Sequence, residues 1–407
     1  MKYLVMLGDG MADLPVPSLG GKTPLETAIK PVMDYLAAHG RGGLVKTVPD
    51  GMVPESDTAN LAVLGYDPLI YSKGRSPLEA MSIGLSMAPD DVAFRCNLVT
   101  ISDDEPYESK IMLDHSAGEI TTEEADELIR SLDEYFGNDV RHLYTGVSYR
   151  HCMIWKNPPG SDKSERIYDF SRPHDILGKP IGEYIPKGSI GGEYGMMYPE
   201  SYKLLINHPV NKKRIGRGLR PANSIWLWSP GKKPALPSFK ARFGLDGTVI
   251  SAVDLIKGIA ICAELKAPSI PGATGTVNTN YEGKAHAAIH AFNSGDSFVY
   301  IHVEGPDECG HRAEIENKVK AIELIDSKIL SPVKNYLDSM GERYRILLLP
   351  DHPTPLCLRT HTREPVPFVI YDSDDINASG ISSFTENSMK SGEFVPEGQK
   401  LINMLIG

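Results

Sequence analysis

Four short, widely separated stretches of this 407-residue chain carry metal-binding side chains and one hydroxyl that could act as a nucleophile. They are Gly8-Asp9-Gly10, Ser56-Asp57, Asp307-Glu308-Cys309-Gly310-His311, and Asp351-His352 followed by His361. Carboxylate oxygens together with imidazole nitrogens suit Mn²⁺, Zn²⁺, Co²⁺ or Mg²⁺. A hydroxyl beside such ions can be activated as an alkoxide nucleophile. The stretches therefore hold the components of a two-metal phosphoryl-transfer site built around Ser56.

Three of these stretches directly follow short apolar runs, which are typical of buried parallel strands. The runs are residues 3–7, 298–303 and 344–349, and they precede Asp9, Asp307 and Asp351 respectively. In open α/β sheets, ligand sites gather at the carboxyl ends of the strands. We therefore expect the three aspartates to meet at one edge of a sheet.

Helical patterns fall between these runs. Amphipathic spacing predicts helices over residues 121–135, 253–265 and 315–330. Ser56 follows Pro54 at the expected start of another helix, where free N–H groups favour a phosphoryl group carried on the hydroxyl. The four-residue spacing of Asp307 and His311 puts both side chains on one side of a helical turn or a tight loop. Because Gly310 disfavours a regular helix, we expect a loop wrapped around an ion.

Taken singly, these residues also have ordinary structural interpretations. Asp9 is compatible with a turn residue, Ser56 with a helix N-cap, and His361 with an exposed loop histidine. The pair Asp351-His352 is compatible with a helix cap beside a core histidine. The coincidence of several candidate ligands with strand ends favours the metal-binding interpretation.

Composition narrows the class of protein. The length predicts two domains, and 41% hydrophobic with 23% charged residues indicates a soluble globular chain. The formal net charge of -11 argues against a nucleic-acid partner. The five cysteines are scattered and never spaced as CxxC, which indicates free thiols in a reducing compartment. The N-terminal apolar run is too short for a secretory signal, and no stretch suits a membrane span. We expect a cytoplasmic protein.

The middle of the chain differs from its ends. Residues 157–200 are rich in Pro, Gly and Ser, and no ligand cluster with its strand occurs between Ser56 and Asp307. The simplest layout is an α/β phosphotransferase domain of residues 1–89 and 248–407, interrupted by an inserted substrate or lid domain of residues 90–247. An insert that excludes water would protect a phosphoserine from hydrolysis.

Longer blocks of sequence carry a family resemblance. They include Gly8-Asp9-Gly10-Met11-Ala12-Asp13, Ser56-Asp57-Thr58-Ala59-Asn60, Asp351-His352-Pro353-Thr354-Pro355, and residues 21–26, 64–68, 91–97, 208–211, 221–223, 250–258 and 271–275. Nearly end to end, the chain resembles the archaeal-type, cofactor-independent (2,3-bisphosphoglycerate-independent) phosphoglycerate mutases of the alkaline phosphatase superfamily. The resemblance implies an alkaline-phosphatase-like sheet core with helices on both faces, interrupted by an inserted α+β domain.

The resemblance also implies a metal assignment and an activity. One ion would take Asp9, Ser56, Asp351 and His352, and the other would take Asp307, His311 and His361. The enzyme would be an isomerase of glycolysis and gluconeogenesis that interconverts 3-phosphoglycerate and 2-phosphoglycerate through phosphoserine at Ser56. It would need two divalent ions but neither bisphosphoglycerate nor a nucleotide, and its partner would be a small phosphorylated substrate.

Further residues are expected to contact this substrate. Lys257 would bind the phosphate from the metal-binding domain. The insert would supply groups for the glycerate carboxylate and for proton transfer. We expect His115 among the catalytic residues, with Arg95, Arg150 and His151 in substrate binding and Arg214 and Asn223 as weaker candidates. Each of these arginines is also compatible with an ordinary surface cation.

Three other functions remain compatible with the sequence. A homoserine kinase-like phosphotransferase is disfavoured because Val16 stands where a P-loop preceding Gly21-Lys22-Thr23 requires its first glycine. A metal-dependent phosphomonoesterase would use the same core. A degenerate metal-binding protein is disfavoured because all seven ligand-type residues are present. The sequence does not predict the oligomeric state.

Overall fold

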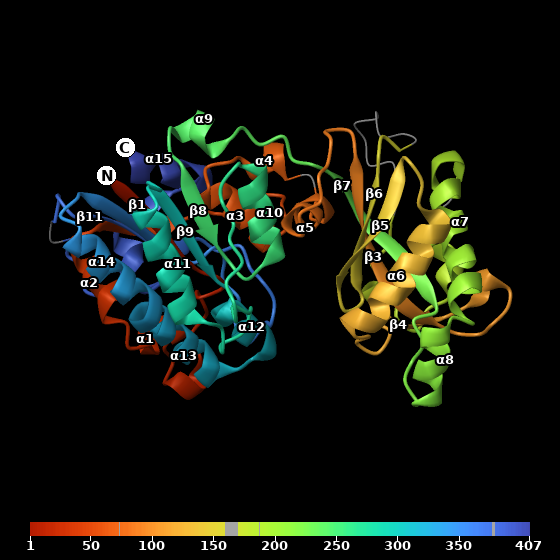
Figure 1. The fold of residues 1–407 in the computed structure, drawn as a ribbon. Coiled ribbons are helices and arrows are strands. Elements are labelled where there is room, and N and C mark those ends of the chain that lie inside the picture. Colours follow the sequence, from red (N-terminus) through yellow and green to blue (C-terminus); the bar gives the residue numbers. More distant parts are fainter. Residues whose placement is uncertain (73, 159–169, 187, 377–378) are drawn as a thin grey trace. The chain divides into compact units, whose positions relative to one another are not determined.

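The computed structural model describes residues 1–72, 74–158, 170–186, 188–376 and 379–407. The chain forms two compact units, one of Met1–Ser72 with Ala235–Gly407 and one of Lys73–Pro234 (Figure 1). These junctions differ from the predicted 89/90 and 247/248. Helix α5 (Ser76–Ser82) belongs to the second unit because it packs on strands β3 (Val92–Ile101) and β7 (Ser224–Lys232). Its Glu79 forms an ion pair with Arg95 of β3.

A mixed sheet of seven strands organises the first unit, in the order β12-β2-β11-β10-β1-β9-β8. The strands are β1 (Lys2–Gly8), β2 (Arg41–Val45), β8 (Gly247–Ile250), β9 (Phe298–Val303), β10 (Tyr344–Leu349), β11 (Val366–Asp372) and β12 (Glu393–Val395). Strand β1 runs parallel to both β9 and β10, with Gly8 opposite Val303 and Leu7 opposite Leu349. The three predicted strands are confirmed, and they end at the same edge of the sheet.

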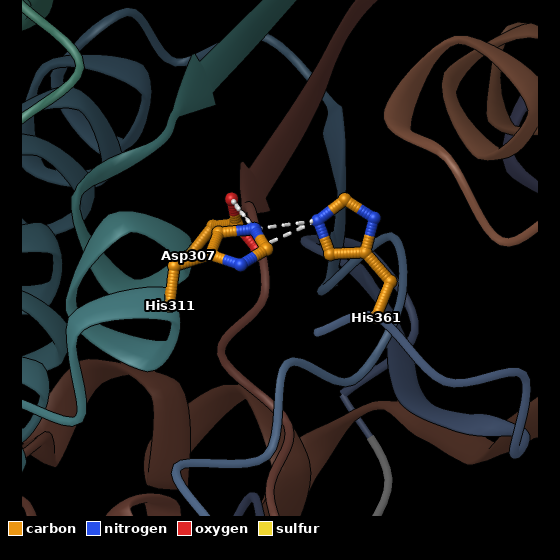
Figure 2. A group of neighbouring side chains, drawn as sticks. All are labelled: Asp307, His311 and His361. Carbon is orange, nitrogen blue, oxygen red and sulfur yellow. Dashed lines mark hydrogen bonds and ion pairs between the residues drawn. The ribbon is translucent and has the colours of Figure 1, made fainter. Parts of the chain in front are cut away.

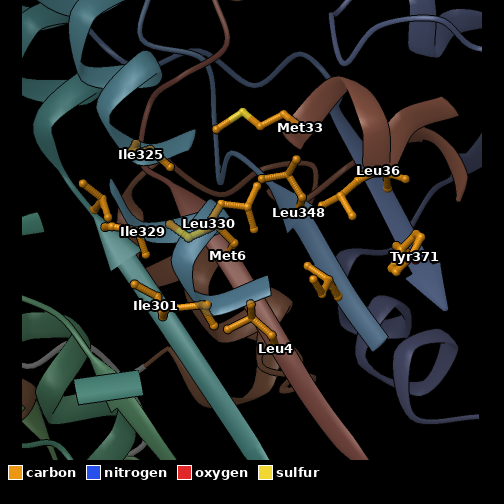
Figure 3. Close-up of a cluster of buried hydrophobic side chains, with 14 of the residues drawn as sticks. Leu4, Met6, Met33, Leu36, Ile301, Ile325, Ile329, Leu330, Leu348 and Tyr371 are labelled. Atoms are coloured by element: carbon orange, nitrogen blue, oxygen red, sulfur yellow. The ribbon is translucent and has the colours of Figure 1, made fainter. Parts of the chain in front are cut away.

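Helices cover both faces of this sheet, as predicted. On one face lie α2 (Pro31–His39), α11 (Tyr281–Asn293), α13 (Ile315–Ile325) and α14 (Ser331–Ser339), with a π-helical turn (Asp326–Leu330) joining the last two. Figure 3 shows Leu4, Met6, Ile301 and Leu348 of the strands packed against side chains of α2 and the π-helical turn. Alternate strand residues point to the other face. There α10 (Asp254–Cys262) contacts β8 and α15 (Leu401–Ile406) contacts β10. Helix α3 (Ser56–Val63) packs against α10, and its Asn60 bonds to Tyr300 of β9.

Asp326 in the π-helical turn caps helix α2 from outside. The residue that precedes this helix, Lys30, makes no side-chain capping bond. Instead, the Asp326 carboxylate accepts hydrogen bonds from the backbone N–H groups of Met33, at 2.7 Å, and Val32, at 3.3 Å. Burial raises the pKa of Asp326 to about 6, although these hydrogen bonds oppose the rise.

The raised pKa of Asp326 predicts a pH-dependent stability difference. Because the folded protein holds this proton more tightly than the unfolded chain does, the contribution of Asp326 to the stability of the wild type falls as the pH rises from about 4 to about 6. An asparagine cannot ionise. We therefore expect the melting temperature of Asp326→Asn, measured relative to the wild type, to increase from pH 4 to pH 7. A difference that stays constant over this range would contradict the assigned shift.

The second unit is an α+β arrangement. Its antiparallel sheet contains β4 (Met112–Asp114), β3, β6 (Arg150–Trp155) and β5 (Arg141–Val147) in that order, and β7 also pairs with β3. Helices α6 (Thr122–Phe136), α7 (Gly188–Leu205) and α8 (Pro209–Gly216) accompany it, and α6 confirms the helix predicted over residues 121–135. In the described part of both units, we find no helix with the length and apolar character needed to cross a membrane.

Candidate metal centre and active site

The first group of candidate ligands lies just beyond β1 and β10. Donor atoms of Asp9, Asp351 and His352 lie within 4.8 Å of one another. His352 Nε2 is 3.6 Å from Asp9 Oδ1 and 3.6 Å from Asp351 Oδ2. All three side chains are buried, and Asp9 Oδ1 has no hydrogen-bond partner among the described residues. A buried carboxylate oxygen without a donor is costly unless a cation faces it, so this group suits a metal ion.

The pKa values of Asp9 and His352 also favour a bound cation in this first group. Burial raises the pKa of Asp9 well above its ordinary value, and the carboxylates of Asp351 and Asp307 raise it further. Burial also lowers the pKa of His352, so its ring is neutral and can offer a lone pair. A divalent cation would stabilise the ionised form of Asp9 and accept that lone pair.

The second group combines a helix with a distant loop. Asp307 and His311 belong to α12 (Gly305–Arg312), and His361 comes from the segment between β10 and β11 (Figure 2). His311 Nε2 and His361 Nε2 lie 3.2 and 3.3 Å from oxygens of Asp307 and 2.9 Å from each other. Each Nδ1 faces a backbone carbonyl, that of Arg359 for His311 and that of Pro54 for His361. Donation from Nδ1 to a carbonyl leaves Nε2 as the atom that can bind a metal.

The Asp307 carboxylate attracts positive charge. Burial alone would raise the pKa of Asp307, but hydrogen bonds from His311 and His361 lower it well below its ordinary value. The Asp307 hydrogen bond in turn raises the pKa of His311 to about 9. Burial opposes the corresponding rise for His361, but its hydrogen bond to Asp307 prevails and the pKa rises. The geometry and charge of this group therefore favour a bound cation as well.

The segment from Asp307 to His311 is helical, so the predicted loop is wrong. Gly310 lies inside α12, where the Thr354 backbone approaches it closely. A Cβ atom at Gly310 would lie only 2.5 Å from the Thr354 carbonyl oxygen. The glycine therefore marks a close contact between α12 and the loop after β10, and not a helix break.

Ser56 is the first residue of α3, so the predicted helix start is confirmed. Its Oγ lies 3.2 Å from His352 Nε2, which places the hydroxyl beside the first group. The N-cap residue, Glu55, makes no side-chain capping hydrogen bond. The N-terminus of α3, with the positive end of the helix dipole, is therefore close to any group carried on Ser56.

Several polar residues that support these groups were missed from the sequence. Asn60, Thr47 and Thr354 each bond to the loop after β10 or to α12, and His302 Nε2 lies 3.1 Å from Asp9 Oδ2. A histidine within the otherwise apolar run 298–303 was a detectable signal. The bond of Thr354 joins segments 47 residues apart, and that of Thr47 joins segments 304 residues apart. No local sequence pattern predicts such bonds.

Thr354 provides a test of this support. Its hydroxyl donates to Asp307 Oδ1, so Thr354→Val keeps the shape of the side chain but leaves that oxygen with His361 Nε2, at 3.3 Å, as its other neighbour. We expect the Mn²⁺ affinity of the chelator-treated protein, measured by calorimetry, to fall by about 10- to 100-fold. The matched control is Thr385→Val, which removes another buried hydroxyl, one bonded to Ser388. Equal affinities in the two variants would contradict a role for Thr354 in orienting Asp307.

Three of the predicted insert residues, Arg95, His115 and Arg150, are linked by ring contacts in the structure. A chain of ring contacts runs through Arg95, Trp228, His174, His115, Tyr149 and Arg150. The Arg95 guanidinium lies 4.5 Å from the Trp228 ring centre, and the ring centres of His115 and His174 are 6.0 Å apart. His174 and Tyr149 join this group without having been predicted.

The other three insert residues are buried and engaged within the second unit. Arg214 bonds to Glu124 and to backbone oxygens of Ala117 and Arg220. Asn223 bridges the backbone N–H and carbonyl of Ile101. Burial lowers the pKa of His151 to about 3, and its Nδ1 accepts a hydrogen bond from Gly146. These contacts give all three residues partners within the second unit, and their predicted substrate contacts stay predictions.

Lys257 lies in the first unit, on helix α10, which packs against α3. Its Nζ forms an ion pair of 2.8 Å with Asp254, one turn earlier. The predicted phosphate contact of Lys257 stays a prediction.

Comparison with known proteins identifies the family. A family model described as 2,3-bisphosphoglycerate-independent phosphoglycerate mutase matches residues 37–211. A protein of that name from Methanosarcina barkeri is 47% identical over 100% of this chain and 99% of its own length. A probable one from Geobacter sulfurreducens is 46% identical over the full length of both chains.

Solved structures agree with the sequence matches. A protein from Pyrococcus horikoshii has a TM-score of 0.81 at 26% identity, covering 100% of this chain and 96% of its own. The cofactor-independent phosphoglycerate mutase from Thermoplasma acidophilum has a TM-score of 0.67 at 26% identity, covering 100% of both chains. On the strength of near-half identity over the full length, the chain belongs to the 2,3-bisphosphoglycerate-independent phosphoglycerate mutase family.

Proposed function

We propose that this chain interconverts 3-phosphoglycerate and 2-phosphoglycerate, as the names of its relatives imply, and acts in glycolysis and gluconeogenesis. The observation that carries this proposal is the serine hydroxyl of Ser56 at a helix start, 3.2 Å from His352 of a buried ligand group. Membership of the mutase family supports the choice of reaction. Neither bisphosphoglycerate nor a nucleotide is expected to take part.

Two divalent ions complete the proposed site. Asp9, Ser56, Asp351 and His352 would hold one, and Asp307, His311 and His361 would hold the other. The mixture of carboxylate and imidazole donors fits Mn²⁺, Zn²⁺, Co²⁺ or Mg²⁺, and the unpartnered Asp9 Oδ1 supports a cation in the first position. When bound, the ions would lower the pKa of the serine hydroxyl and neutralise phosphoryl oxygens.

The proposed reaction proceeds in two displacements at phosphorus. Ser56 Oγ loses its proton and attacks in line, an Oγ–P bond forms, and the bond from phosphorus to the 3-oxygen of the substrate breaks. That oxygen takes up a proton, which leaves phosphoserine and glycerate. The 2-hydroxyl of the glycerate then loses its proton and attacks the same phosphorus, which restores Ser56. The N–H groups at the start of α3 stabilise negative charge on the phosphoryl oxygens in both steps.

The remaining assignments stay predictions. Arg95 and Arg150 are proposed to bind the glycerate carboxylate, His115 to move protons, and Lys257 to contact the phosphate. The ring contacts that connect Arg95, His115 and Arg150 support a shared role for them. A cytoplasmic location is also proposed from the sequence.

The test is an enolase-coupled assay of purified protein with Mn²⁺ and without bisphosphoglycerate. We expect conversion of 3-phosphoglycerate that a chelator abolishes and added Mn²⁺ restores. Release of phosphate faster than isomerisation would replace the proposal with a phosphomonoesterase. ATP-dependent phosphorylation of homoserine without isomerisation would replace it with a kinase.

A further inference from the structure

We propose that Asn60 is a positioning residue that ties the nucleophile Ser56 to the metal ligand Asp351, and that Tyr300 fixes the orientation of its amide. The inference rests on the proposed function, because it gives Ser56 and Asp351 their roles. Neither Asn60 nor Tyr300 belongs to the ligand groups described above.

The contacts of Asn60 join three separate parts of the first unit. Its Nδ2 donates to the Ser56 carbonyl oxygen at 2.8 Å and to Asp351 Oδ2 at 2.9 Å. Its Oδ1 accepts from the Tyr300 hydroxyl at 2.5 Å. Asn60 lies in α3, Tyr300 in the middle of β9, and Asp351 after β10. Asn60, Tyr300 and Asp351 are all fully buried, so water does not compete for these bonds.

The Asn60 amide has only one orientation that satisfies its neighbours. Both partners of Nδ2, a carbonyl and a carboxylate, are acceptors. Rotation of the amide by half a turn would set Oδ1 against those two acceptors. Tyr300 prevents the rotation because its hydroxyl donates to Oδ1, and burial raises its pKa so that the hydroxyl remains protonated. The tyrosine thereby fixes which atom of Asn60 faces the ligand group.

The Asp351 carboxylate is held from two sides. Its Oδ1 accepts from the backbone N–H groups of Gly10, at 3.1 Å, and His352, at 2.9 Å. Its Oδ2 accepts from Asn60. Because the same Nδ2 also holds the first turn of α3, a shift of Asp351 would be coupled to a shift of Ser56. Asn60 therefore sets the distance between the attacking hydroxyl and a ligand of the ion expected to activate it.

The test compares matched variants in the full-length protein. Asn60→Leu keeps approximately the volume of the side chain but removes all three bonds, and Tyr300→Phe removes only the bond that orients the amide. The controls are Asn211→Leu and Tyr198→Phe in the second unit. Asn211 is also fully buried and bonds to three backbone groups, and the buried Tyr198 hydroxyl donates to the Leu227 carbonyl.

Three quantities are measured for each variant: the melting temperature, the Mn²⁺ affinity of the chelator-treated protein, and kcat and KM in the mutase assay. We expect Asn60→Leu to lower Mn²⁺ affinity and kcat by about 10- to 100-fold with KM nearly unchanged, because Asn60 supports groups that bind the metal and the phosphoryl group. Tyr300→Phe should show the same pattern with a smaller loss. The two controls should lower only the melting temperature.

If Asn60→Leu has the same Mn²⁺ affinity and kcat as the Asn211→Leu control, the inference is overturned and Asn60 is a structural residue. If Asn60→Leu does not fold, Tyr300→Phe decides in the same way against its Tyr198 control. Failure of the wild type in the mutase assay would reject the proposed function alone. The Mn²⁺ titrations would then still decide whether Asn60 positions Asp351.

Discussion

Replacement of Ser56 by alanine should reduce mutase turnover by at least about 10⁴-fold, because it removes the atom to which the phosphoryl group is transferred. The fold should persist. Ser56 is the first residue of α3, where alanine is compatible with the helical backbone, and within the described residues its Oγ contacts His352 and no backbone group. We expect a stability change of no more than about 1 kcal/mol, measured by thermal or denaturant unfolding.

The matched control is Ser331→Ala, which changes the first residue of another helix, α14, in the same unit. This variant should retain wild-type turnover. The Ser56→Ala protein should also keep the second group of Asp307, His311 and His361, and should therefore still bind Mn²⁺ there. Turnover above about one hundredth of the wild-type rate in Ser56→Ala would reject the phosphoserine route.

The part of the fold that positions the site was predictable from sequence because the decisive signal is local. Strands β1, β9 and β10 are short apolar runs, and each is followed within a few residues by a carboxylate. Parallel pairing brings the ends of such strands to one edge, whatever the separation in sequence. The proximity of Asp9 and Asp351 therefore follows from two apolar runs that are each followed by an aspartate. Parallel strands whose ends lie at the same edge of the sheet bring these two residues together.

Features that depend on contacts between distant segments escaped prediction. Gly310 has low helical propensity, yet it lies inside α12, at a position where the Thr354 backbone leaves no room for a side chain. The predicted boundary at 89/90 ignored α5, whose membership in the second unit depends on packing against β3 and on the pair of Glu79 with Arg95. Helix propensity describes the preference of an isolated segment. The position of Gly310 and the membership of α5 in the second unit both depend on tertiary packing.

The insert shows why residue type is a weak guide to function. In the sequence, Arg95 and Arg150 are candidates for binding a carboxylate, and Arg214 is a weaker one. In the structure, Arg214 is buried with Glu124 and two backbone oxygens, whereas Arg150 is exposed beside the Tyr149 ring. A buried guanidinium that already makes three hydrogen bonds within its own unit has fewer donors left for a ligand than an exposed one. Burial is a property of the assembled unit, so the sequence alone does not show which of these arginines is buried.

The second large effect is expected from Asp351→Asn. The two carboxylate oxygens of Asp351 accept hydrogen bonds from the backbone of Gly10 and His352 and from Asn60. An asparagine must turn its NH₂ group toward one of these sets of donors, and it also loses the negative charge that a divalent ion requires. We expect bound Mn²⁺, measured by elemental analysis after dialysis, to fall from two ions to one per chain. Turnover should fall by at least about 10³-fold.

The reason for a partial loss of metal is the separation of the two donor groups. Asp307, His311 and His361 are held by the carbonyls of Arg359 and Pro54 and by Thr354, none of which depends on the charge of Asp351. Asp296→Asn is the matched control, because Asp296 is also buried and accepts from Thr248 and Lys266 but belongs to neither group. This control should be less stable and yet bind two ions. Two tightly bound ions in active Asp351→Asn would show that Asp351 is not a ligand, and the first metal position would have to be assigned to other residues.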